Sequence, residues 1–179
     1  AGLIPWRTSW WVAVERPGVT PHPRFRRTNV LTDDTLIFAG PIRDKHAAQR
    51  LVETLEDLFD LCRYHHILVQ APHGKACAYK EMGKCPAPCD GSISLAAYQQ
   101  QIDAAVAFLT NRTVEGRSPR EAWREKLEGQ MKAAAAALQF ETAGKIKQRL
   151  SRAGLLETEY FAARGGLEDL GVLALQPGK

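Results

Sequence analysis

The chain has 179 residues, of which 45% are hydrophobic and 25% charged, with a formal net charge of +4 and a pI of about 9.0. That hydrophobic content excludes a disordered tail, and the length suits one domain or two small ones. No apolar run is long enough to cross a bilayer and nothing near Ala1 resembles a signal peptide, so we expect a cytoplasmic protein without a membrane partner. The mild basic bias permits a nucleic-acid partner without requiring one.

The N-terminal part predicts a small β unit. Residues 10–15 (WWVAVE) are interpreted as one strand, and the prolines that follow mark a loop. Residues 24–31 (RFRRTNVL) and 35–40 (TLIFAG) are β-type runs joined by Thr32-Asp33-Asp34, which predicts a β-hairpin that ends at Gly40-Pro41. The first run also carries a small basic patch, which consists of Arg24, Arg26 and Arg27.

Two helices are predicted to flank the next stretch. Apolar residues recur at helical spacing over residues 45–61, so this segment predicts an amphipathic helix that packs on the hairpin, with Cys62 at its end. Ser94 is a suitable N-cap for a second helix that continues to about residue 110. The polar residues 111–116 then mark a domain boundary, and the first domain is taken as residues 1–110.

A helical hairpin is predicted over residues 117–152. Ser118, Pro119 and Glu121 are typical of a helix start. The serine is a suitable N-cap, the proline fits the first helical position, and the glutamate side chain can accept a hydrogen bond from the backbone N–H of the serine. A break near residues 139–141 divides the apolar stripe, and so short a link favours antiparallel helices that approach closely along the alanines of residues 133–137. In residues 153–179, LETEYFAAR is compatible with helix and GVLALQ with a strand. The expected fold class is therefore α+β.

All four cysteines of the chain lie in one short, loop-like stretch, and they are Cys62, Cys77, Cys85 and Cys89. The last three form a C-x7-C-x3-C run, CAYKEMGKCPAPC, which glycine and prolines keep out of regular structure. Four thiols gathered in this way indicate a metal or cluster site, and the spacing alone leaves zinc and iron–sulfur open. Nearby basic residues could offset thiolate charge, and these are Arg63, Lys75, Lys80 and Lys84.

Histidines lie in the same stretch, at positions 65, 66 and 73. One of them could replace a cysteine in a zinc site, but four cysteines make this unnecessary, and we expect ordinary polar residues there. The sequence contains no Gly-rich phosphate loop and no H-E-x-x-H or G-x-S-x-G motif, so no catalytic residue is assigned.

Three stretches of the chain, in the right order, resemble the UvrC family of bacterial excinuclease subunits. LCRYHH followed by CAYKEMGKCPAPCDGSIS is similar to the cysteine-rich region of that family, with Tyr79, Gly83 and Pro88 at matching places. REKLEGQMKAAAAALQFETAGKIKQRL resembles its UVR motif. The segment IFAGPIRDKHAAQRLVETLEDLFDLC looks like the stretch between the family's N-terminal nuclease domain and its cysteines.

The resemblance implies a role in nucleotide excision repair, in which UvrC cuts damaged DNA on both sides of a lesion. It implies that the four cysteines ligate a 4Fe–4S cluster. It also implies that the helical hairpin docks on UvrB, with Leu138, Phe140 and Glu141 as the expected contacts. The residues expected to touch DNA phosphates are Arg24, Arg26, Arg27 and Lys84.

The departures from the family pattern limit what is carried over. The GIY-YIG and RNase H-like nuclease motifs are not found, so the chain alone is not expected to be an enzyme. Lys147-Gln148 stands where the UVR motif usually has Arg-Asp, which bears on partner choice. Two alternatives remain: a nuclease with an unrecognised active site that uses Trp6, Arg7 or Glu15, and a zinc-dependent adaptor with no DNA role.

Overall fold

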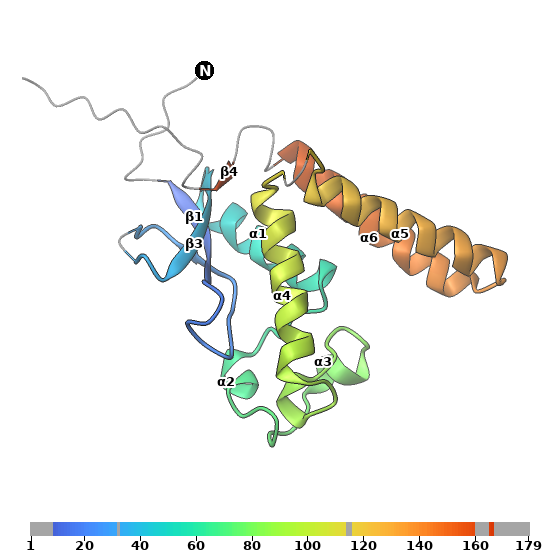
Figure 1. Cartoon of the computed structure of the whole chain (residues 1–179), viewed down its shortest axis with the longest axis horizontal. Coiled ribbons are helices and arrows are strands. Elements are labelled where there is room, and N and C mark those ends of the chain that lie inside the picture. Colours follow the sequence, from blue (N-terminus) through green and yellow to red (C-terminus); the bar gives the residue numbers. More distant parts are fainter. Residues whose placement is uncertain (1–8, 32, 114–115, 160–164, 167–179) are drawn as a thin grey trace, which may run out of the picture.

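The structure is a computed structural model that describes residues 9–31, 33–113, 116–159 and 165–166 (Figure 1). A small antiparallel sheet lies beside helices α1 and α4, and a long helical hairpin of α5 and α6 extends away from them. The described residues therefore confirm the α+β fold class. Within them, no helix combines the length and the apolar character needed to cross a membrane.

The sheet contains β1 (Trp10–Glu15), β2 (Arg26–Thr28), β3 (Leu36–Ile42) and β4 (Gly165–Gly166), in the order β2-β1-β3-β4 with antiparallel pairing. The predicted hairpin between residues 24–31 and 35–40 is wrong, because β1 lies between its two arms. The physical reason is burial: Val12, Ala13 and Val14 are fully buried, which suits a central strand, whereas the three residues of β2 are all half-exposed.

Strand β3 also continues through Gly40-Pro41, where the sequence predicted an end. A Cβ atom at Gly40 would come within 2.8 Å of the Trp11 ring, so only glycine lets β3 pass this side chain. The register between β1 and β3 shifts between Trp10 and Val12, opposite this close approach.

Helix α1 (Lys45–Leu58) begins at Asp44, whose carboxylate accepts from the N–H groups of His46 and Ala47. It packs its apolar face on the sheet and ends at Leu58 rather than at residue 61. Asp60 takes a left-handed conformation with φ 52°, and the Leu61 N–H bonds the Glu56 carbonyl at 2.9 Å, as in a Schellman cap. Cys62 therefore follows a capped turn and is not the last helical residue.

The cysteine stretch contains only short helices: α2 (His65–Leu68), α3 (Ala78–Glu81) and the 3-10 turn η2 (Pro88–Asp90). The long helix α4 (Leu95–Thr110) follows, and the Ser94 hydroxyl accepts from the Ala97 N–H at 3.1 Å, which confirms the predicted N-cap. Its buried face includes Phe108, which lies 5.5 Å from the Phe59 ring.

Helices α5 (Pro119–Ala136) and α6 (Phe140–Glu159) form the predicted antiparallel hairpin, and the Ser118 hydroxyl accepts from the Glu121 N–H. The alanine run is not the helix interface: Ala134 is buried while the other alanines of residues 133–137 are exposed, because successive residues of a helix point in different directions. Helix α6 continues past the predicted boundary at 152. Residues 171–176, considered as a strand, lie outside the described residues.

The base of the hairpin is fixed to the rest of the protein. The Trp123 ring packs 5.6 Å from Phe59 and 5.0 Å from Phe108. On α6, the Arg149 guanidinium donates to the Leu58 carbonyl and, at 2.9 Å, to the Asp60 carboxylate. These contacts hold one end of the hairpin against α1 and α4, while the turn between α5 and α6 projects outward (Figure 1).

Candidate metal centre

The four cysteines come from separate points of the stretch between α1 and α4. Cys62 follows the end of α1, Cys77 is the N-cap residue of α3, Cys85 precedes η2 and Cys89 lies within it. Cys62, Cys85 and Cys89 are buried, and Cys77 is half-buried. This stretch lies around the N-terminal end of α4 (Figure 1).

The sulfurs of Cys62 and Cys85 are in direct contact. The hydrogen bond between them lowers the pKa of Cys85 to about 7 and raises the pKa of Cys62, which acts as the thiol donor. Burial raises the pKa of Cys89, and the charges of Asp90, Cys85 and Cys77 act in the same direction. The sulfurs of Cys62, Cys85 and Cys89 therefore influence one another, and of these three groups only Cys85 has a lowered pKa.

Backbone groups also face the sulfurs. The Ala87 N–H donates to the Cys85 sulfur at 3.4 Å, and Ala87 reaches this position through a left-handed conformation with φ 56°. The Cys89 thiol lies 3.8 Å from the Lys75 carbonyl, and the Cys62 thiol 3.6 Å from the Tyr64 carbonyl. The N–H bond to the Cys85 sulfur favours its thiolate form.

Two of the four basic residues expected to offset thiolate charge pair with carboxylates, and one of them, Arg63, also acts to lower the pKa of Cys85. The Lys80 ammonium lies 2.6 Å from both the Asp90 carboxylate and the Ser92 hydroxyl, and this pairing lowers the pKa of Asp90 to about 2. The Arg63 guanidinium pairs with Asp57 and lies 4.7 Å from the centre of the Tyr79 ring. Lys80 therefore links α3 to the segment after η2, and Arg63 links the cysteine stretch to α1.

A buried phenol connects this stretch to α4. The Tyr98 hydroxyl accepts a hydrogen bond from the Cys62 N–H at 3.1 Å, and only 1% of Tyr98 is exposed. The sequence did not identify Tyr98 as a partner of Cys62. The available signal was a polar atom on an otherwise apolar helix face, which requires a hydrogen-bond partner once it is buried.

Replacing Tyr98 by phenylalanine is expected to lower the free energy of unfolding by about 1–3 kcal/mol, because the buried Cys62 N–H loses its acceptor. Urea unfolding followed by circular dichroism measures this change. Tyr64→Phe is the matched control, since Tyr64 is 42% exposed. Equal stability of both variants would contradict a structural role for the Tyr98 hydroxyl.

The donor set suits a thiolate-bound centre in residue type and location. Among the described residues, no three His, Cys, Asp or Glu side chains are arranged to hold a single metal ion. His65 is bonded to the His22 carbonyl, and His66 and His73 are exposed. The Cys62 and Cys89 thiols face backbone carbonyls, so loading a metal requires deprotonation and reorientation of these side chains. The four cysteines thus remain the candidate ligands.

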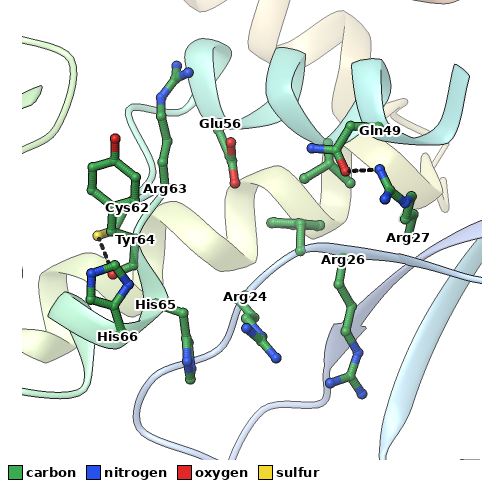
Figure 2. Close-up of a pocket in the computed structure, with 12 residues that line it drawn as sticks. Arg24, Arg26, Arg27, Gln49, Glu56, Cys62, Arg63, Tyr64, His65 and His66 are labelled. Carbon is green, nitrogen blue, oxygen red and sulfur yellow. Dashed lines mark hydrogen bonds between the residues drawn. The ribbon is translucent and has the colours of Figure 1, made fainter. Parts of the chain in front are cut away.

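A cavity of about 610 Å³ lies next to Cys62 (Figure 2). It is called here the arginine pocket, and its lining residues are Arg24, Phe25, Arg26, Arg27, Gln49, Val52, Glu56, Cys62, Arg63, Tyr64, His65 and His66. Three of the four residues expected to contact DNA therefore surround one cavity, and Lys84 does not line it. On its α1 wall, burial raises the pKa of Glu56 to about 7, against the opposing effect of Arg63.

The expected partner-binding residues lie at the turn of the helical hairpin. Leu138 and Phe140 are 73% and 68% exposed, and Glu141 is exposed and lies 2.8 Å from Lys145. Leu138 has a φ of 58°, and the Gln139 N–H bonds the Ala134 carbonyl at 2.9 Å to close α5. The three residues are thus placed together at the projecting end, which is called here the hairpin tip.

Of the residues considered for an unrecognised nuclease site, Trp6 and Arg7 lie outside the described residues. Glu15 is within β1, where its carboxylate accepts from the Arg24 N–H at 2.8 Å and lies 3.5 Å from the Arg26 guanidinium. Through these contacts Glu15 has a structural role, because it joins β1 to the segment before β2.

Comparison with known proteins gives a consistent result. A model of the UvrC/Cho excinuclease middle domain matches residues 9–108. The UvrABC system protein C of Moorella thermoacetica is 30% identical over 85% of this chain, that of Syntrophotalea carbinolica 31% over 65%, and that of Alkalilimnicola ehrlichii 32% over 75%. No solved structure matches.

The chain therefore belongs to the UvrC/Cho excinuclease family, and it corresponds to the middle region of a UvrC-like excision repair protein. It covers between 18% and 24% of the lengths of these three relatives.

Proposed function

We propose that this chain is a non-catalytic middle region that binds a structural 4Fe–4S cluster, docks a UvrB-like partner through the hairpin tip and contacts the DNA backbone. The observation that carries the proposal is the gathering of all four free cysteines, three of them buried and one half-buried, in the stretch between α1 and α4. A site of this kind, in a domain without a recognised catalytic motif, is suited to hold segments together.

The proposed role of the cluster is to hold together segments of the cysteine stretch that are separate in sequence. The cysteine stretch contains only short helices and turns, and most of its backbone hydrogen bonds join near neighbours, with Gly74 to Cys89 as a longer link. A bound cluster supplies iron–thiolate bonds, which would join the segment after α1, the start of α3 and η2. The same thiols suit zinc, which is the alternative cofactor; an iron–sulfur protein is brown, whereas a zinc protein is colourless.

The hairpin tip has the character of a docking surface. Leu138 and Phe140 expose large apolar side chains at the end of the hairpin that is far from the rest of the protein. A leucine in the left-handed region costs about 1–2 kcal/mol relative to the right-handed region, and at Leu138 no burial offsets this cost. A partner that covers both side chains would supply the missing burial.

DNA contact is proposed for the basic residues Arg24, Arg26, Arg27 and Lys84. Arg24 and Lys84 are exposed, and Arg26 and Arg27 are half-exposed. Contacts between such side chains and phosphates add affinity without sequence specificity, and they weaken as salt is raised.

Partner binding provides the test of this function. We expect titration of the anaerobically purified chain into a UvrB-like protein to give saturable, one-to-one heat, and incubation with damaged duplex and Mg²⁺ or Mn²⁺ to give no cleavage. Absence of binding would contradict the docking role. Cleavage that depends on Glu15 would favour the nuclease alternative.

A further inference from the structure

The arginine pocket carries positive charge that the protein does not neutralise. Arg26 lies 3.5 Å from Glu15 and 4.0 Å from Asp33, and Arg63 pairs with Asp57. Among the described residues, no acidic side chain pairs with the guanidinium of Arg24 or Arg27, and Arg27 donates to the neutral amide of Gln49 at 2.6 Å. Arg24 lies between Tyr64 and Arg26 in Figure 2, and its guanidinium thus remains suited to an anion such as phosphate.

Aromatic rings lie at the other end of the same cavity. Tyr64 is 42% exposed, and its ring lies 5.7 Å from that of His66 and 5.5 Å from that of Tyr79. These neighbours support the Tyr64 ring from the side while leaving much of it open. In Figure 2, the rings of Tyr64 and His66 lie at one end of the view, and Arg26 and Arg27 at the other.

Polar and apolar groups complete the space between these two ends. Glu56 and Gln49 reach into it from α1 (Figure 2), and the buried residues Phe25 and Val52 line its wall. A cavity of about 610 Å³ lies within the usual range for small-ligand sites, roughly 300–1,000 Å³. A stacking ring, hydrogen-bonding groups and an arginine without an acidic partner are together the features that a nucleotide requires.

We propose that the arginine pocket binds one unstacked nucleotide of single-stranded DNA, with its base on Tyr64 and its phosphate on Arg24. The proposal rests on the DNA contact proposed above and makes it specific. A base enters a cavity only when it is outside the duplex stack, so the favoured ligand is a single strand rather than a paired region. Stacking on one ring tolerates any base, so no sequence preference is expected.

The experiment measures fluorescence anisotropy of the metal-loaded chain with a labelled oligothymidine, an abasic strand of equal length and a duplex. Oligothymidine is expected to bind more tightly than the other two. Tyr64→Ala is expected to weaken oligothymidine binding about tenfold and to leave abasic binding unchanged, whereas Tyr64→Phe retains the affinity. Arg24→Gln is expected to weaken binding of both strands and to reduce the salt slope by about one.

Arg43→Gln is the matched control for charge, because Arg43 is exposed and lies outside the pocket. Equal affinity for abasic and normal strands, together with no effect of Tyr64→Ala, would overturn the nucleotide pocket while leaving non-specific backbone contact intact. If neither strand nor duplex binds, the proposed DNA contact fails as well. Equal weakening by Arg24→Gln and Arg43→Gln would also overturn the assignment of the phosphate to this pocket.

Discussion

Replacement of Cys85 by serine is expected to abolish cluster binding and to destabilise the loop between α1 and α4. Cys85 is buried, it accepts from the Ala87 N–H, and its hydrogen bond from Cys62 lowers its pKa to about 7. A serine hydroxyl is a far weaker ligand for iron than a thiolate, so one corner of the cluster would be lost. Because metal binding stabilises the folded state, we expect a clear fall in unfolding temperature.

Anaerobic purification followed by visible spectroscopy, iron analysis and thermal unfolding measures this effect. Met82→Ser is the matched control, since Met82 lies in the same loop and is 56% exposed without being a candidate ligand. The Met82 variant should keep its colour and its unfolding temperature. If Cys85→Ser retained the full metal content and stability, the assignment of the site would be wrong.

Replacement of Phe140 by alanine is expected to weaken binding of a UvrB-like partner by about thirtyfold, the effect of removing one central aromatic contact. The free energy of unfolding should change little, because Phe140 is 68% exposed and its ring contributes little packing within the chain. Isothermal titration calorimetry with the partner, alongside urea unfolding of the free chain, separates these two effects.

Leu138→Gly is a companion variant that makes the test sharper. Glycine adopts the left-handed conformation at no steric cost, so this change should raise the free energy of unfolding by about 1 kcal/mol while weakening partner binding. Lys45→Ala, at an exposed position of α1 outside the hairpin, serves as the control. Should both tip variants bind the partner as tightly as Lys45→Ala, docking through the tip would be refuted.

The helices could be predicted from the sequence because their signals are local. Ser94 and Ser118 each lie directly before a periodic apolar segment, and both cap a helix as expected. The sheet could not be predicted in the same way, since adjacent β-type runs do not reveal that β1 inserts between β2 and β3. Pairing of β1 with β3 joins residues far apart in the chain, and burial of both faces of β1 decides it.

The candidate site was predictable only in part for a similar reason. The four cysteines are close in sequence, so their grouping was visible without a structure. By contrast, the hydrogen bond from Cys62 to Tyr98 joins residues that are distant in the chain. The arginine pocket also joins distant residues, because Arg24 and Tyr64 line the same cavity. Such arrangements depend on how α1, α4 and the β2 segment pack together. Local sequence patterns do not contain this information.

Counting iron and acid-labile sulfide in the anaerobically purified wild-type chain tests the central claim most directly. If the four cysteines hold one 4Fe–4S cluster, each chain should contain about four iron atoms and about four sulfides, and the protein should be brown. A colourless protein with about one zinc per chain would contradict the cluster and favour the alternative of a zinc-dependent adaptor. A chain with neither metal, whose cysteines all react freely with a thiol reagent in the native state, would contradict the shared centre itself.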